Sequence, residues 1–183
     1  MDNITFKSDI RFVPLSKFNK YVNSFGSSNC VNYPWTVEQS VLSQNAYTKF
    51  ILDCTAVGIT DGSKVLLMHL CPTRQENKIF RNIENYIESK INMMDKHSIQ
   101  GFLLGSRNVA ESRKLFDNIL NLLKKLNISV SYFKNSLYEN NISYSSITDE
   151  WLISNSFIKQ NNDVENYINS FAEVKISTSD KIV

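Results

Sequence analysis

Two apolar runs on either side of Asp61-Gly62 constrain the fold of this chain more than any other feature. They belong to the segment LDCTAVGITDGSKVLLMHL, residues 52–70, and both contain β-branched side chains. An Asp-Gly dipeptide between such runs favours a β-hairpin whose two-residue turn is of type I′. We therefore expect a pair of antiparallel strands here, with Asp61 and Gly62 as the two central residues of the turn.

That turn also sets which residues face each other across the hairpin. With Asp61 and Gly62 in the turn, Cys54 lies directly opposite His69. Opposed side chains have Cβ atoms about 4.5–5.5 Å apart, so the thiol and the imidazole meet on one face. An imidazole can take the proton of a neighbouring thiol and leave a nucleophilic thiolate, so we expect iodoacetamide to alkylate Cys54 first near neutral pH. The alternative is structural: Cys54 is a buried thiol and His69 fills a hydrogen-bonding position in the core.

The other two cysteines are weaker candidates for a nucleophile. Cys30 lies in the polar stretch of residues 23–32, and Cys71 is expected on the strand face opposite to His69. Three cysteines are too few, and odd in number, for a disulfide framework, so we expect free thiols in a reducing compartment. Cys71, His69 and His97 form no recognisable metal-ligand pattern, and no metal or organic cofactor is expected.

Helix-like and strand-like segments alternate after the hairpin. Apolar side chains that recur every three or four residues predict amphipathic helices, and short apolar runs between turn residues predict strands. Helices are expected over residues 36–44, 74–94, 108–126 and 163–174. Strands are expected over residues 49–52, 99–105 and 128–133, and within residues 142–157. No repeat or persuasive boundary interrupts the chain, so we expect a single domain over residues 1–183.

Charge and hydropathy exclude two kinds of partner. The formal net charge is +2, and acidic and basic residues are mixed along the chain, unlike the basic field of a nucleic-acid-binding protein. No apolar run approaches the 18 or so residues of a membrane span, and the N-terminus has no recognisable cleavable signal. We therefore expect no nucleic-acid partner and no insertion into a membrane.

The segment around the expected hairpin resembles a family of bacterial enzymes. TKFILDC (residues 48–54), followed by a strand, a tight turn and LLMHLCP (residues 66–72), is similar to the Cys–His core of the protein glutamine deamidases. These include the chemoreceptor deamidase CheD and the toxin domains of the cytotoxic necrotising factor and lethal-factor type. In CheD and the lethal-factor type a Thr shortly before the nucleophile completes a Thr–Cys–His set, and Thr48 is the matching residue. A second similarity, to CheD, covers residues 104–130, where a GSRN turn precedes a long helix and a strand.

The chain departs from the family pattern in two places. Leu52 and Asp53 stand where the family usually has small residues before the nucleophile. We expect them to crowd the oxyanion site, and we expect the Asp53 carboxylate to raise the thiol pKa by like-charge repulsion. The second departure follows the expected strand over residues 128–133, where KNSLYENN replaces the family's Gly-Gly.

The resemblance implies a fold and an activity. The fold is an α/β (α+β) layered sandwich of two mixed β-sheets flanked by helices. The activity is deamidation of a protein glutamine, with Cys54 as the nucleophile and His69 as the base that later protonates the departing ammonia. Thr48 orients His69 through its backbone carbonyl or its hydroxyl, and the backbone N–H of Cys54 is one candidate oxyanion donor.

The resemblance also implies a partner, and alternatives to deamidation stay open. The substrate is a protein that carries a reactive glutamine, either a chemoreceptor or a host protein. The enzyme then acts in the bacterial cytoplasm, or in the host cytosol after delivery by a specialised secretion system. A transglutaminase or a cysteine peptidase can use the same Cys–His pair. A non-catalytic protein-binding module of the same fold is a further alternative, in which Cys54 has no unusual reactivity.

Overall fold

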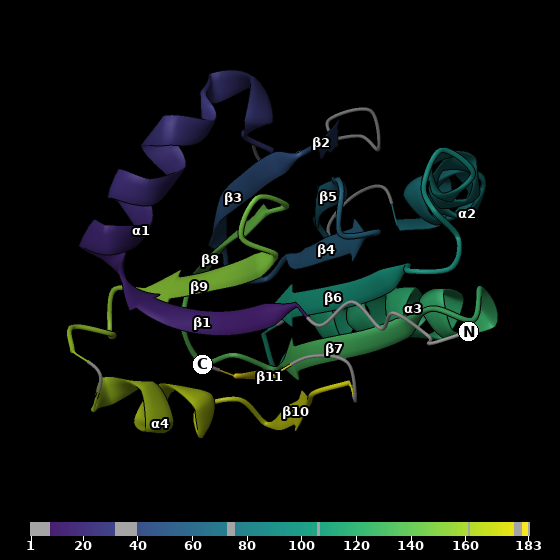
Figure 1. Ribbon diagram of the computed structural model, residues 1–183. Helices are drawn as coiled ribbons and strands as arrows, with labels where there is room; N and C mark the ends of the chain where they lie inside the picture. The colour runs from purple at the N-terminus through teal and green to yellow at the C-terminus, as the bar shows by residue number, and fades with distance from the viewer. Residues whose placement is uncertain are drawn as a thin grey trace.

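Two β-sheets stacked face to face form the centre of the molecule, and helices cover the outer face of each sheet (Figure 1). The computed structural model describes residues 8–31, 40–72, 76–105, 107–160, 162–177 and 181–182. Both sheets contain parallel and antiparallel pairs of strands. The expected fold class, a layered sandwich of two mixed sheets flanked by helices, is confirmed at this level.

The first sheet has five strands in the order β11-β1-β9-β8-β3. Their bounds are Asp9–Pro14 (β1), Asn45–Ile51 (β3), Asn140–Ser145 (β8), Glu150–Asn155 (β9) and Lys181–Ile182 (β11). β1 is parallel to β9 and to β11, whereas β8 is antiparallel to both of its neighbours. Helix α1 (Leu15–Val22) covers the outer face, where its Phe18 and Val22 pack near Leu152 of β9. Two short 3₁₀ helices follow α1, at Asn23–Phe25 (η1) and Ser27–Asn29 (η2).

The second sheet has six strands in the order β10-β7-β6-β4-β5-β2. Their bounds are Val41–Ser43 (β2), Thr55–Thr60 (β4), Val65–Leu70 (β5), Gln100–Gly105 (β6), Ser129–Lys134 (β7) and Glu173–Lys175 (β10). Only the β6–β7 pair of this sheet is parallel among the described strands. The helices α2 (Glu76–Ile91) and α3 (Ala110–Lys125) pack on its outer face, and α4 (Asp163–Ile168) precedes β10. Within the described residues, no helix combines the length and apolar composition needed to cross a membrane.

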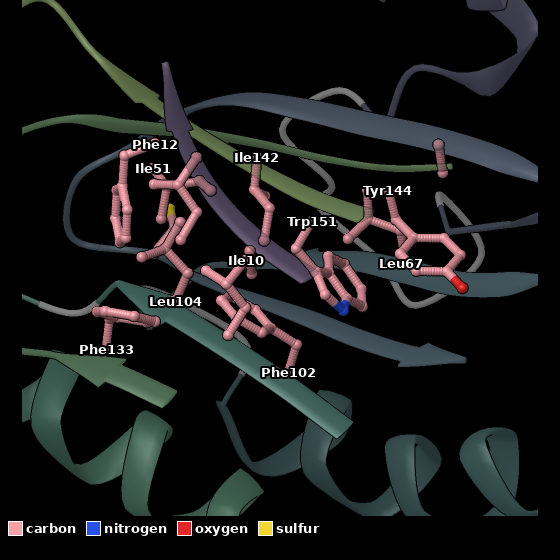
Figure 2. Close-up of a cluster of buried hydrophobic side chains, with 14 of the residues drawn as sticks. Ile10, Phe12, Ile51, Leu67, Phe102, Leu104, Phe133, Ile142, Tyr144 and Trp151 are labelled. Atoms are coloured by element: carbon pink, nitrogen blue, oxygen red, sulfur yellow. The ribbon is translucent and has the colours of Figure 1, made fainter. Parts of the chain in front are cut away.

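The core between the two sheets is built from large apolar side chains of both (Figure 2). Trp151 of β9 stacks on Phe102 of β6, with ring centroids 4.9 Å apart. Gly58 of β4 makes room for this indole, because a Cβ at that position would lie 2.1 Å from Cη2 of Trp151. The face of β4 and β5 that points toward the first sheet therefore borders a closely packed interior.

Most of the expected elements are present, and two expectations are wrong in part. Residues 41–43, within the expected helix over residues 36–44, form the edge strand β2, because pairing with β5 outweighs local helix preference. Residues 36–39 of that expected helix lie outside the described residues. The last expected helix ends at Ile168, and the chain then pairs with β7 as β10.

Candidate functional site

The hairpin of β4 and β5 forms as predicted, but its turn lies one residue later. The N–H of Asp61 donates to the carbonyl of Lys64 over 3.3 Å, so Gly62 and Ser63 are the central residues of the turn. Gly62 has a φ of 83°, and a glycine at the first central position is typical of a type II′ turn. The Asp61 carboxylate accepts hydrogen bonds from the N–H groups of Ser63 (2.9 Å) and Lys64 (3.0 Å), which holds Asp61 at the corner.

This shift changes the partner of each residue in the hairpin. Ala56 lies opposite His69, and Thr55 lies opposite Leu70, so the prediction that Cys54 directly opposes His69 is wrong. Moving the centre of the turn by one residue moves each cross-strand partner by two. Because side chains alternate with a period of two, Cys54 stays on the face of Ala56 and His69, which is the face toward the first sheet. Cys54 and His69 are therefore diagonal neighbours on one face, a separation that a long side chain such as histidine can span.

Thr48 and His69 join the two sheets inside the core. Thr48 belongs to β3 of the first sheet and His69 to β5 of the second, and both residues are fully buried. The hydroxyl Oγ1 of Thr48 lies 2.7 Å from Nδ1 of His69. Of the two groups of Thr48 that were expected to orient the ring, the hydroxyl therefore makes this contact. Because Nδ1 contacts Thr48, the imidazole would exchange a proton with a thiol through its other ring nitrogen, Nε2.

Burial keeps both members of the expected Cys–His pair uncharged. Desolvation lowers the pKa of His69 to about 4, so the imidazole is neutral at physiological pH. Desolvation also raises the pKa of the Cys54 thiol, and a hydrogen-bonded thiol at Cys71 and the Asp53 carboxylate raise it further. These shifts favour a protonated Cys54 thiol and a neutral imidazole in the resting site, and the influence of Asp53 has the expected direction. The rapid alkylation expected of Cys54 stays a prediction.

Cys71 lies closer to Cys54 than the sequence analysis predicted. It was expected on the opposite face from His69, but Cys71 lies two positions after His69, so both side chains belong to the same face. The thiols of Cys54 and Cys71 are hydrogen-bonded to each other, and both residues belong to the core between the sheets. Cys30 instead forms an isolated bridge with Tyr47, whose side chain packs beneath α1 on the outer face of the first sheet.

Two described residues of the GSRN segment, Gly105 and Arg107, contact the loop that carries Cys54. Gly105, at the end of β6, has a φ of 122°, and a Cβ there would lie 2.5 Å from the carbonyl oxygen of Cys54. Arg107 forms an ion pair with Asp53 at 3.3 Å, and both side chains are about half exposed. The two segments that resemble the deamidases therefore meet at Cys54.

Sequence reasoning missed a strained residue beside the site. Phe50 has a φ of 63° and an exposed fraction of 67%, and it lies where the pairing of β3 with β8 is irregular between Thr48 and Ile51. Its N–H donates to Oδ1 of Asn141 over 3.2 Å. A bulky residue with positive φ is rare, and such strain clusters at functional sites. Nothing in the local sequence marks Phe50, because phenylalanine is an ordinary strand residue.

Two described cavities lie away from this cluster. One, of about 370 Å³, is lined by the end of α2, the segment that follows it and the residues between α3 and β7. The other, of about 240 Å³, is lined by α3, β7, the end of β10 and the residues around these strands. Neither is lined by Thr48, Cys54 or His69. Among the described residues, no three His, Cys, Asp or Glu side chains are grouped to hold a metal ion.

The sequence matches no protein-family model and no curated protein. The likeness to the glutamine deamidases therefore depends on the residues quoted above and on the cluster of Thr48, Cys54 and His69.

Proposed function

We propose that this protein is a protein glutamine deamidase, with Cys54 as nucleophile, His69 as proton carrier and Thr48 as the residue that positions His69. The single observation that carries the proposal is the hydrogen bond between Thr48 Oγ1 and His69 Nδ1, on the sheet face that also bears Cys54. A base held by a third group, beside a potential nucleophile, is the arrangement that covalent catalysis requires.

The protonation states of the resting site suit a general-base mechanism. Serine enzymes activate a hydroxyl of very high pKa with a neutral imidazole that takes the proton as the new bond forms. The raised pKa of the Cys54 thiol and the lowered pKa of His69 supply the same starting pair, a protonated nucleophile and a neutral base. Proton transfer then accompanies attack and needs no thiolate in the free enzyme.

The reaction proceeds through a thioester. The sulfur of Cys54 attacks the side-chain amide carbon of the glutamine while His69 accepts the thiol proton. His69 gives that proton to the leaving nitrogen, so that ammonia departs and the carbon–nitrogen bond breaks. Water then attacks the thioester, His69 takes a proton from it, and glutamate leaves as the Cys54 thiol re-forms.

The site is nearly closed, which fits a substrate that enters as a single flexible side chain. Cys54 exposes 4% of its surface and His69 exposes none. Asp53 and Arg107 are each about half exposed beside the Cys54 loop and form a polar margin to it. We propose that the glutamine of a chemoreceptor or host protein approaches over this margin.

Mass spectrometry of glutamine-containing proteins tests the proposal. Incubation with the wild type should raise the mass of a target glutamine by about one unit, because a water oxygen replaces the amide nitrogen. In ¹⁸O-labelled water the increase should be about three units, since the new oxygen comes from solvent. Cys54→Ser should abolish the conversion, whereas Cys30→Ser should leave it unchanged. Conversion by Cys54→Ser at the wild-type rate, or no conversion by the wild type across a broad set of proteins, would overturn the proposal.

The same experiment separates the alternative activities. A transglutaminase joins an added primary amine to the glutamine, and a peptidase cuts the chain, whereas a deamidase releases ammonia. A small amount of amine-linked product at high amine concentration is compatible with deamidation, because an amine competes with water for the thioester.

One observation favours a second candidate, a protein-binding module without catalysis. Cys54 and His69 are both buried, and burial raises the pKa of the Cys54 thiol, as in a structural pair. In that case Cys54→Ala should keep the partner-binding affinity of the wild type, and no glutamine should be converted by either protein.

A further inference from the structure

Cys54 and Cys71 occupy opposed positions just past the end of the hairpin ladder. The ladder of β4 and β5 ends with Thr55 opposite Leu70, and the next pair in the same register is Cys54 and Cys71. Both belong to the cluster between the sheets, so their side chains leave the hairpin on the same face. The influence of Cys71 on Cys54 agrees with this placement, because the Cys71 thiol raises the pKa of the Cys54 thiol as a hydrogen-bond partner.

The position of this pair in the pattern of the ladder suits a disulfide bond. Opposed pairs in an antiparallel ladder alternate between hydrogen-bonded and non-hydrogen-bonded. Asp61 donates to Lys64, which makes that pair the hydrogen-bonded kind, and an odd number of steps separates it from the pair of Cys54 and Cys71. Continued one step past the end of the ladder, this alternation puts Cys54 and Cys71 at a non-hydrogen-bonded position, where opposed Cα atoms of a regular ladder lie about 4.5 Å apart. Disulfides span Cα separations of about 4.4–6.8 Å, a range that includes this ladder spacing.

The surroundings of the pair favour an internal bond over other fates of the thiols. Cys54 exposes 4% of its surface and Cys71 exposes 8%, which leaves little room for glutathione or a second protein chain. Cys30, the remaining cysteine, lies at the bridge to Tyr47 on the other side of the first sheet. If a small oxidant reacts with one of the two buried sulfur atoms, the other thiol is therefore the cysteine next to it.

We propose that Cys54 and Cys71 form a reversible intramolecular disulfide when the protein meets a small two-electron oxidant such as hydrogen peroxide. One sulfur attacks a peroxide oxygen, the oxygen–oxygen bond breaks, and a sulfenic acid and a water molecule form. The second sulfur attacks the sulfenic sulfur, the sulfur–oxygen bond breaks, and a second water leaves with the formation of the sulfur–sulfur bond. In total the two thiols lose two electrons and two protons, and a dithiol reductant returns them.

Such a bond has a consequence for catalysis that rests on the proposed function. A disulfide removes the nucleophilic sulfur of Cys54, so deamidation should stop on oxidation and return after reduction. The bond itself is independent of any substrate. Formation of the bond and loss of activity can therefore be measured separately.

The test uses the full chain, purified under reducing conditions, oxidised with hydrogen peroxide and then denatured in N-ethylmaleimide. The oxidised protein should accept the reagent at one of its three cysteines, and peptide mapping should give a linked pair that contains Cys54 and Cys71. Before alkylation the protein should be about 2 Da lighter than the reduced form. Cys30→Ser should form the same bond, whereas Cys71→Ser should not, with thermal unfolding confirming that each variant folds.

Several outcomes would overturn the inference. One is a sulfinic acid on Cys54 with Cys71 still reactive to the maleimide, and another is a linked pair that includes Cys30. A third is wild-type protein in which Cys30 is oxidised while both buried thiols stay unmodified. The mapping of the wild type decides these outcomes even when Cys71→Ser fails to fold.

Failure of this inference is distinguishable from failure of the proposed function. A linked pair of Cys54 and Cys71 in a protein that deamidates nothing when reduced would support the disulfide and contradict the deamidase. Deamidation by the reduced protein that continues unchanged after peroxide treatment, without a linked pair, would contradict the disulfide alone.

Discussion

Thr48 Oγ1 lies 2.7 Å from Nδ1 of His69, and the two residues belong to different sheets of the sandwich. The hydrogen bond crosses a core built largely from apolar side chains. A buried polar contact of this kind is stabilising only while both partners are present, because either one alone would be desolvated without compensation. The pair therefore connects the packing of the sheets to the orientation of the proposed base.

The first prediction concerns the hydroxyl of Thr48. Thr48→Val keeps the shape of the side chain but removes the group that contacts Nδ1, so it should lower the free energy of unfolding by about 1–3 kcal/mol. On a glutamine target it should lower the deamidation rate about tenfold to a hundredfold, since each 1.4 kcal/mol corresponds to a factor of ten. Thr48→Ser keeps the hydroxyl and should retain most of both properties.

Nitrogen chemical shifts of the imidazole distinguish positioning from mere packing in this series. The shifts of His69 should report one fixed tautomer in the wild type and in Thr48→Ser, and a mixture in Thr48→Val. Equal rates and the same tautomer in Thr48→Val would contradict a positioning role for Thr48.

The second prediction concerns acid stability. The pKa of His69 is lowered from 6.5 to about 4 in the folded protein, so the unfolded chain binds a proton at this residue more readily. Its contribution to stability is therefore complete above pH 6.5 and is lost as the pH falls toward about 4. The full loss amounts to about 3 kcal/mol, since one pKa unit corresponds to about 1.4 kcal/mol.

Urea unfolding at a series of pH values checks this loss. His69→Gln should remove most of the pH dependence between about pH 6.5 and pH 4, because it removes the titrating group. The exposed His97 supplies the matched variant, His97→Gln, against which the effect of His69→Gln is compared. A wild-type slope that survives His69→Gln would mean that other groups cause the acid sensitivity.

A third prediction concerns the close approach of Gly105 to Cys54. Gly105→Ala should lower the free energy of unfolding by about 1–3 kcal/mol through overpacking, in addition to backbone strain. The added Cβ would lie 2.5 Å from the carbonyl oxygen of Cys54, and φ is 122°. Gly26→Ala is the matched control, because φ is 80° there but the nearest atom would lie 4.0 Å away. Denaturant unfolding should show a larger loss for Gly105→Ala, and equal losses would mean that the approach is relieved by a small shift of the loop.

The fourth prediction uses the ion pair of Asp53 and Arg107. The Asp53 carboxylate raises the pKa of the Cys54 thiol, although less than burial does. Asp53→Asn should therefore speed the alkylation of Cys54 by iodoacetamide, by less than about tenfold, which corresponds to less than one pKa unit. Arg107→Ala removes the counter-charge at 3.3 Å and should slow the same reaction.

Peptide-specific mass spectrometry measures these alkylation rates in a Cys30→Ser background, so that only the two buried thiols are followed. Asp163→Asn, at the start of α4, is a charge-matched control that should have no effect. Rates that change in the same direction in Asp53→Asn and Arg107→Ala would show that packing of the loop, rather than its charges, controls the thiol.

The sequence by itself determined the hairpin and the common face of Cys54 and His69. β-branched runs around a turn dipeptide specify a hairpin. Side chains along a strand alternate with a period of two, so a two-residue turn centred on Asp61-Gly62 or on Gly62-Ser63 leaves Cys54 and His69 on the same face. The long amphipathic segments likewise predicted α2 and α3, since a periodic apolar stripe needs no knowledge of its partner.

The tertiary structure decided the register, the partners and the charges. Gly62-Ser63 rather than Asp61-Gly62 became the centre of the turn, because the Asp61 carboxylate binds the N–H groups that follow it. Thr48 reached His69 only through the stacking of two sheets, and Cys71 became the neighbour of Cys54 only through the shifted register. The pKa values of Cys54 and His69 follow from burial, which depends on all the chain packed around them and is not encoded in the few residues of a motif.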